Sequence, residues 1–136
     1  MLSLPLPVRI FLCTQHADLR RSFDGLAQLV REFLGADPLS GHLFVFRNKR
    51  GDRLKLLYWD SDGYAIWYKR LEEGTFALPP TDATRPTLGT HGVCLRPAEL
   101  AMLLDGIDLA NIKRRRRYQR PPTQANPEHR ADAGAG

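Results

Sequence analysis

Two groups of basic residues are the strongest chemical signal in this 136-residue sequence. The segment 47–70 carries seven Lys or Arg against three Asp, and the segment 113–120 reads KRRRRYQR. Guanidinium groups bind phosphates through paired hydrogen bonds, and each phosphate that a cation neutralises releases counterions. Both segments therefore suit a polyanion such as DNA, although a solvated surface, a solubilising tail or an acidic protein partner would explain the same charges. The candidate phosphate-binding residues are Arg47, Lys49, Arg50, Arg53, Lys55, Lys69, Arg70, Lys113, Arg114, Arg115, Arg116 and Arg117.

Aromatic residues lie among the first group of cations. The segment 42–71 contains Phe44, Phe46, Tyr58, Trp59, Trp67 and Tyr68. Aromatic rings stack on nucleic-acid bases, and exposed tryptophans anchor protein partners, so Trp59 and Trp67 are candidate aromatic anchors. The same rings would also stabilise a small sheet through cross-strand pairs without any ligand, and the sequence leaves both roles open.

No arrangement of residues in the sequence predicts a catalytic or metal site. Asp60 and Asp62 fall in a Gly-ended turn, where carboxylates bond the local backbone, and the further ligands of a calcium loop are missing. The four histidines are scattered, Cys13 and Cys94 form no zinc-type cluster, and no phosphate-binding glycine motif is present. The sequence therefore predicts neither an enzyme nor a metal or other cofactor.

The cysteine content and the N-terminal stretch predict a cytoplasmic protein. Two cysteines suit a reducing compartment better than a disulfide-stabilised secreted domain. The stretch MLSLPLPVRIFLC is interrupted by prolines and has no charged start, so it is a poor signal peptide and too short to span a membrane. We therefore expect no membrane partner.

A strand and a helix are expected ahead of the basic segment. Residues 8–14, VRIFLCT, are rich in β formers and predict the strand. Asp18 offers an N-cap for a helix over residues 19–34, whose apolar side chains recur at helical spacing. Gly35, followed by Asp37-Pro38, predicts the end of this helix.

Residues 42–48, 53–59 and 64–71 predict three antiparallel strands joined by two short turns. Gly51 and Gly63 are the expected left-handed residues of these turns.

Side chains alternate between the two faces of a strand, and one face of this meander must cover the core beneath the helix. The other face is expected to keep cations among aromatics and to be the binding surface. On that face we place Trp59, Trp67, Arg53, Lys55 and Lys69.

The remainder of the chain predicts an irregular crossing over residues 72–92, a short strand over 93–97 and a second helix. Pro97 suits the first turn of that helix, and Gly106 is expected to end it. The segment 113–136 has too little apolar content to fold and predicts a basic, disordered tail. The predicted architecture is a single small α+β domain over residues 1–112, of order β-α-β-β-β-(β)-α, in which an antiparallel β-meander packs against helices.

Three stretches of the sequence resemble a known family. SFDGLAQLVREFLG, DPLSGHLFVFRNKRGDRLKLLYWDSDGYAIWYKRLEEGTF and LLDGIDL…KRRRRY look like the small accessory protein called TnpB, or Orf2, of the bacterial insertion-sequence sixty-six family. The resemblance covers residues 8 to about 118 and implies a role in transposition beside a separate DDE-type transposase encoded by the same element. It implies no catalytic residues. The chain is not similar to the RNA-guided nucleases that share the TnpB name, since it cannot supply their carboxylate site.

Two functions follow as expectations from this resemblance and from the residues. In the first, the protein is a non-catalytic accessory factor that binds DNA, at the element ends or along any backbone, through the basic hairpin and the Arg-rich tail. In the second, it is an adaptor that docks on the transposase without contacting DNA, with Trp59 or Trp67 as the anchor. Both functions would place the cytoplasmic protein at the bacterial nucleoid, and the sequence does not separate them.

Overall fold

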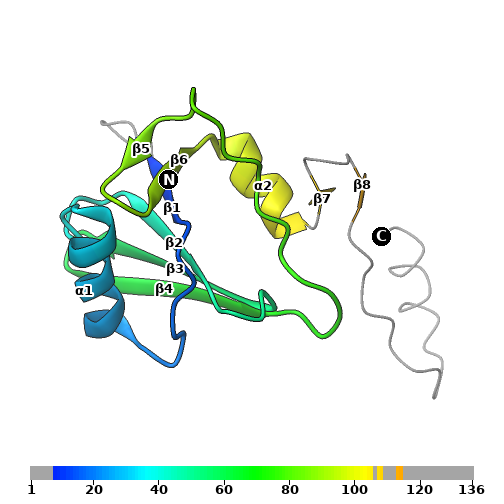
Figure 1. The fold of residues 1–136 in the computed structure, drawn as a ribbon. Coiled ribbons are helices and arrows are strands. Elements are labelled where there is room, and N and C mark those ends of the chain that lie inside the picture. The colour runs from blue at the N-terminus through cyan, green and yellow to red at the C-terminus, as the bar shows by residue number, and fades with distance from the viewer. Residues whose placement is uncertain (1–7, 106, 109–112, 115–136) are drawn as a thin grey trace, which may run out of the picture.

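A mixed six-stranded sheet with one helix on each side makes up most of the described chain (Figure 1). The computed structural model describes residues 8–105, 107–108 and 113–114. The helices are α1 (Phe23–Leu34) and α2 (Pro97–Asp105), and the strands are β1 (Ile10–Cys13), β2 (Leu43–Arg47), β3 (Arg53–Asp60), β4 (Gly63–Arg70), β5 (Thr87–Leu88), β6 (Gly92–Leu95), β7 (Ile107–Asp108) and β8 (Lys113–Arg114). The large sheet has the order β4-β3-β2-β1-β6-β5, and β7 pairs with β8. The predicted α+β class is confirmed.

Strands β2, β3 and β4 form the predicted antiparallel meander. Leu56 in β3 lies opposite Val45 in β2 and opposite Trp67 in β4. Strand β1 was predicted, but its place was not: it runs parallel to β2, with Phe11 opposite Phe44, and antiparallel to β6. A parallel pair needs a crossover connection, and α1 lies within that connection. The meander is thus one half of a larger mixed sheet.

Most of each face of the large sheet is buried, which corrects the prediction of one open face. Helix α1 covers one face and forms the α1-side core, which includes Phe11, Leu26, Val30, Phe44, Phe46 and Leu57. The other face carries the α2-side core, which includes Leu12, Val45, Leu54, Phe76, Leu100 and Leu103. Helices α1 and α2 accordingly lie on opposite sides of the sheet in Figure 1. Basic residues can reach a ligand only from the rim of the sheet and from loops.

Helix α1 begins at Phe23 rather than at Leu19, because Asp18 is used in a local turn. The Asp18 carboxylate accepts a hydrogen bond from the backbone N–H of Arg20 at 3.0 Å and also binds the Arg20 guanidinium at 2.8 Å. A side chain satisfied in this way does not cap the helix that follows. The end of α1 is as predicted, with Gly35 in the left-handed region at φ 56°.

One of the two predicted turn residues is confirmed and the other is wrong. Gly51 has φ 78°, as expected for the turn between β2 and β3. In the turn between β3 and β4, Ser61 has φ 56° and takes the left-handed position that the sequence assigned to Gly63. Serine tolerates this region at a modest cost.

The last third of the described chain is irregular up to β5, a two-residue strand that the sequence did not predict. Strand β6 and helix α2 lie where a short strand and a second helix were expected. Gly106, the expected end of that helix, lies outside the described residues. Strand β8, which opens the predicted tail, pairs with β7. Residues 115–136 lie outside the description, so the disordered tail and the domain boundary at residue 112 stay predictions.

Candidate nucleic-acid interface

A groove of about 440 Å³ opens between two loops that are far apart in the sequence. One loop joins β2 to β3 over residues 48–52, and the other leads from β1 towards α1 over residues 14–22. The backbone N–H of Ala17 donates to the carbonyl of Arg47 at 2.9 Å and holds the second loop against the end of β2. The polar residues that line the groove are His16, Asp18, Arg20, Asn48, Lys49, Arg50 and Arg53.

The loop over residues 48–52 is held by hydrogen bonds of its own. Asn48 accepts a hydrogen bond from the backbone N–H of Arg53 at 3.0 Å and donates one to the Asp52 carboxylate at 2.7 Å. The hydrogen bond that the Asn48 side-chain amide donates to Asp52 is the main reason that the pKa of Asp52 is lowered. Gly51 is buried, and its carbonyl accepts a hydrogen bond from the N–H of Phe76 at 2.8 Å. The loop is therefore tied to the body of the protein at its centre.

Positive charge dominates the groove. Four Lys or Arg side chains line it against one carboxylate, that of Asp18. The Arg20 guanidinium binds both oxygens of this carboxylate and lowers the pKa of Asp18 to about 2. Lys49 and Arg50 are exposed, and among the described residues no carboxylate forms an ion pair with either of them. Asp52, in the loop beside the groove, interacts electrostatically with Arg50 and Arg53. An anion entering the groove would still meet more cations than carboxylates.

The sequence predicted three of the groove's cations and missed the fourth. Lys49, Arg50 and Arg53 were predicted as phosphate-binding residues, and the structure brings them together. Arg20 falls within the helix that was predicted over residues 19–34, and His16 was assigned no role. Both residues reach the groove only because their loop is bound to the end of β2, about thirty positions along the chain. No local pattern in the sequence signals that contact.

Two predicted phosphate-binding residues instead donate hydrogen bonds to the protein's own backbone. Lys55 is 8% exposed, and its ammonium donates to the carbonyl of Arg21 at 2.8 Å and lies 4.7 Å from the centre of the Tyr68 ring. Arg47 is half-buried and donates to the carbonyl of Phe76 at 2.7 Å, and this burial lowers the pKa of its guanidinium. These contacts occupy both cations with the protein's own backbone. We therefore exclude Lys55 and Arg47 from the interface.

The remaining cations of the meander divide between the two faces. Arg53 lies opposite Arg70 across the β3–β4 ladder, and its guanidinium donates to the Tyr68 hydroxyl at 3.2 Å. Arg70 forms an exposed ion pair with Glu72 at 2.7 Å, which raises its pKa. Lys69 lies opposite Leu54 and so belongs to the other face. Arg70 is thus next to the groove, whereas Lys69 is not.

The prediction that the two tryptophans share a face is wrong. Trp59 lies opposite Tyr64, on the face of α1, and its ring meets the Tyr64 ring edge-on at 5.1 Å. Trp67 lies opposite Leu56, on the face of α2. Trp59 is half-buried, and Trp67 is 39% exposed. Only Trp67 therefore remains a candidate anchor for a partner.

The Arg-rich run is described only in part. Lys113 and Arg114 form strand β8, and Arg115, Arg116 and Arg117 lie outside the described residues. Their assignment to phosphate binding stays a prediction.

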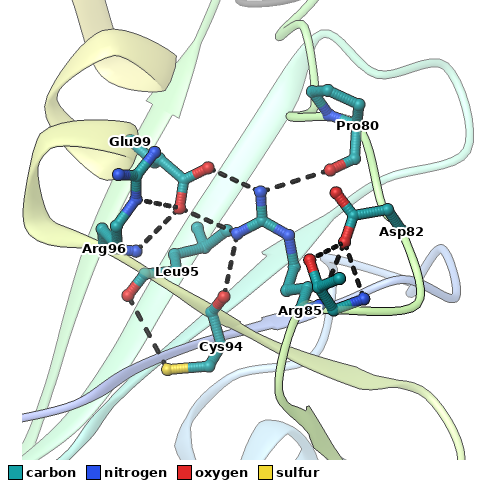
Figure 2. A network of polar contacts seen from close by, with 8 residues as sticks. Pro80, Asp82, Arg85, Cys94, Leu95, Arg96 and Glu99 are labelled. Carbon is teal, nitrogen blue, oxygen red and sulfur yellow. Dashed lines mark hydrogen bonds and ion pairs between the residues drawn. The ribbon is translucent and has the colours of Figure 1, made fainter.

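A second polar cluster, which the sequence did not reveal, lies at the start of α2 (Figure 2). The Arg85 guanidinium binds the Glu99 carboxylate through two hydrogen bonds of 2.6 and 2.8 Å and also donates to the carbonyls of Cys94 and Pro80. The Glu99 carboxylate accepts a further hydrogen bond from the backbone N–H of Arg96 at 2.9 Å. A glutamate at the third position of a helix makes the same bond in a capping box. Its side chain is 4% exposed, and Arg85 lowers its pKa to about 2. This cluster joins the irregular segment to β6 and α2, which is a structural role.

The described residues give little support to a metal site, a reactive Cys13 thiol or a membrane-spanning helix. Within residues 8–105, no group of three or more His, Cys, Asp or Glu side chains is placed to hold a metal ion. Cys13 is buried, and this burial raises the pKa of its thiol, so its reactive thiolate form is scarce at neutral pH. None of the helices in this part of the chain is long and apolar enough to cross a membrane.

Known proteins resemble the chain over most of its length. Two uncharacterized proteins of Sinorhizobium fredii (strain NBRC 101917 / NGR234) are similar to it. The protein y4jC is 40% identical over 79% of this chain and 86% of its own length, and y4hO is 39% identical over 74% and 82%. No solved structure is significantly similar to the chain. The family model described as IS66 Orf2 like protein matches residues 8–114, and this family implies an accessory role in transposition. The chain therefore belongs to the IS66 Orf2-like family of insertion-sequence accessory proteins.

Proposed function

We propose that this protein serves transposition by binding the phosphate backbone of DNA in the groove between residues 16–20 and 48–53. The observation that supports the proposal is the charge of the groove: Arg20, Lys49, Arg50 and Arg53 line it, and its one carboxylate, Asp18, is already bound by Arg20. Guanidinium groups suit phosphate oxygens because their planar donors match them in pairs.

The groove's chemistry favours binding to the backbone over reading of the base sequence. Backbone contacts give affinity that depends steeply on salt and little on sequence. Hydrogen bonds of Asn48 hold the backbone of the loop over residues 48–52, which carries Lys49 and Arg50. Less conformational entropy is therefore lost when a phosphate binds. The Arg-rich run after residue 112 would add a second contact with the backbone.

One observation favours the adaptor alternative. Trp67 and its neighbour Tyr68 are 39% and 48% exposed, and exposed aromatic residues often anchor protein partners. In this second candidate function the protein docks on the transposase through β4, and the groove has no part in the contact.

A DNA titration with charge-matched variants tests the proposal. The groove variant Lys49→Ala/Arg50→Ala/Arg53→Ala removes three cations, and the control variant Arg9→Ala/Arg31→Ala/Arg96→Ala removes three exposed cations elsewhere. Each full-length protein is titrated with element-end duplex and with scrambled duplex of the same length at several salt concentrations.

We expect the groove variant to bind both duplexes more weakly and its salt dependence to flatten by about 2 to 3 in log–log slope, close to one for each lost phosphate contact. The control variant should keep most of the slope. Equal losses in the two variants would show that only net charge matters and would refute the groove as the site. If the groove variant binds DNA normally while Trp67→Ala no longer co-purifies with the transposase, the adaptor function is favoured instead.

A further inference from the structure

The outer edge of β4 is the most conspicuous unused surface of the sheet. Strand β4 is the first strand in the sheet order, and its inner edge pairs with β3 along all eight of its residues. In the described part of the chain, no strand pairs with its outer edge. An antiparallel strand directs alternate N–H and C=O groups away from its neighbour, so this edge offers a row of backbone donors and acceptors.

Between Tyr64 and Tyr68, β4 carries none of the charged side chains that usually protect an edge strand. Trp67 and Tyr68 are 39% and 48% exposed, and they are two of the four large hydrophobic residues that are exposed in the described chain. They lie on opposite faces of the sheet, so an apolar surface flanks the edge on both sides. The opposite end of the sheet is different, because β5 has only two residues.

Strand β4 is complementary to a second copy of itself. Asp60 ends β3, Asp62 lies in the turn before β4, and Lys69 and Arg70 lie at the end of β4. When two copies run antiparallel about a twofold axis at Ile66, Asp62 of each copy lies opposite Arg70 of the other.

The same register also matches the side chains nearer the axis. Tyr64 lies opposite Tyr68, which gives an aromatic pair on the face of α1. Ala65 lies opposite Trp67, so the small side chain leaves room for the indole on the other face. Moving the axis to Trp67 would instead place Asp62 opposite Glu72 and bring two carboxylates together.

We infer that β4 is a homodimer interface, in which two copies pair through their β4 edges about Ile66 and form one continuous sheet. The existing Arg70–Glu72 pair does not oppose this arrangement, because both of its side chains are more than half exposed and such pairs contribute little. The inference does not depend on DNA binding, since the groove cations lie outside the paired strands.

Sedimentation equilibrium of the full chain, freed of nucleic acid, tests the interface by charge reversal. Asp62→Arg and Arg70→Asp each place like charges opposite one another, and the double variant restores the pair in the reverse sense. Lys49→Asp changes the net charge of the protein as much as Arg70→Asp does, but away from the edge, and serves as the control. Far-UV circular dichroism and thermal unfolding confirm that each variant is folded.

We expect the wild type to dimerise over the micromolar range, each single reversal to raise the dimer dissociation constant at least tenfold, and the double variant to recover most of this loss. Lys49→Asp should leave the constant within about twofold of the wild type. Trp67→Ala, which removes the indole opposite Ala65, should also weaken the dimer. A wild type that stays monomeric at high micromolar concentration overturns the inference. So does a dimer that the reversals leave unchanged, or one that the folded double variant fails to restore.

Discussion

Replacing Glu99 by Gln should destabilise the protein by about 3 kcal/mol at neutral pH. Arg85 holds the pKa of the Glu99 carboxyl at about 2, below its ordinary value of 4.5. The carboxylate is 4% exposed, so solvent screens the ion pair weakly. The difference between the two pKa values corresponds to about 3 kcal/mol of folding free energy that the charged carboxylate contributes.

This contribution has a definite pH dependence. Because the pKa of Glu99 is lower in the folded than in the unfolded state, the contribution is complete above about pH 4.5 and is lost as the pH falls towards 2. About 2 kcal/mol of it is gone at pH 3. The glutamine does not titrate, so the difference in unfolding free energy between wild type and Glu99→Gln should shrink from about 3 kcal/mol at pH 7 to about 1 kcal/mol at pH 3.

Urea unfolding followed by circular dichroism at a series of pH values measures this difference. Glu72→Gln is the matched control, since Glu72 also pairs with an arginine but is 51% exposed. Its effect should be within about 0.5 kcal/mol of zero at every pH. If the Glu99→Gln difference is the same at pH 7 and at pH 3, the charge of Glu99 is not what stabilises the cluster.

Three further predictions concern the cations, the tryptophans and the tail. Lys55→Met should lower the unfolding free energy by about 1 to 2 kcal/mol, because it removes the bond to the Arg21 carbonyl, and should leave DNA affinity unchanged in the titration described above. Trp59→Ala should cost about 2 kcal/mol in urea unfolding and Trp67→Ala about 1 kcal/mol, because Trp59 is the more buried; the reverse order would contradict the described burial. Deleting residues 115–136 should leave the thermal midpoint unchanged while it weakens DNA binding and flattens its salt dependence; a lower midpoint would show that the tail is structural.

The meander could be predicted from the sequence because its signals are local. Alternating side chains give each strand, and short turns fix which strands are neighbours. The register of one strand relative to the next could not be predicted in this way. A change of one residue in register moves every side chain of a strand to the other face of the sheet. The turn at Ser61 sets that register, and its effect was to separate Trp59 from Trp67.

The parts that could not be predicted all depend on contacts between distant residues. Arg20 lines the groove only because its loop is bonded to the end of β2, and Arg85 meets Glu99 only after the irregular segment has folded against α2. The burial of Lys55 could not be predicted either, because the alternating pattern of the strand does not show that the Lys55 ammonium binds the backbone carbonyl of Arg21. Residue type identified the cations, but only tertiary packing separates the structural ones from those that are free to bind.

The position of β1 in the sheet has a consequence for the order in which the protein folds as it is synthesised. Phe11 is paired on one side with Phe44 and on the other with Cys94, so one edge of β1 can pair early and the other only after most of the chain has emerged. Long-range pairings of this kind form slowly, because the intervening chain must first be ordered. We expect α1 and the first four strands to assemble first on the ribosome. The edge of β1 that pairs with β6 would then stay unpaired until β6 and α2 have been synthesised. During that time it could pair with other chains that are being synthesised nearby.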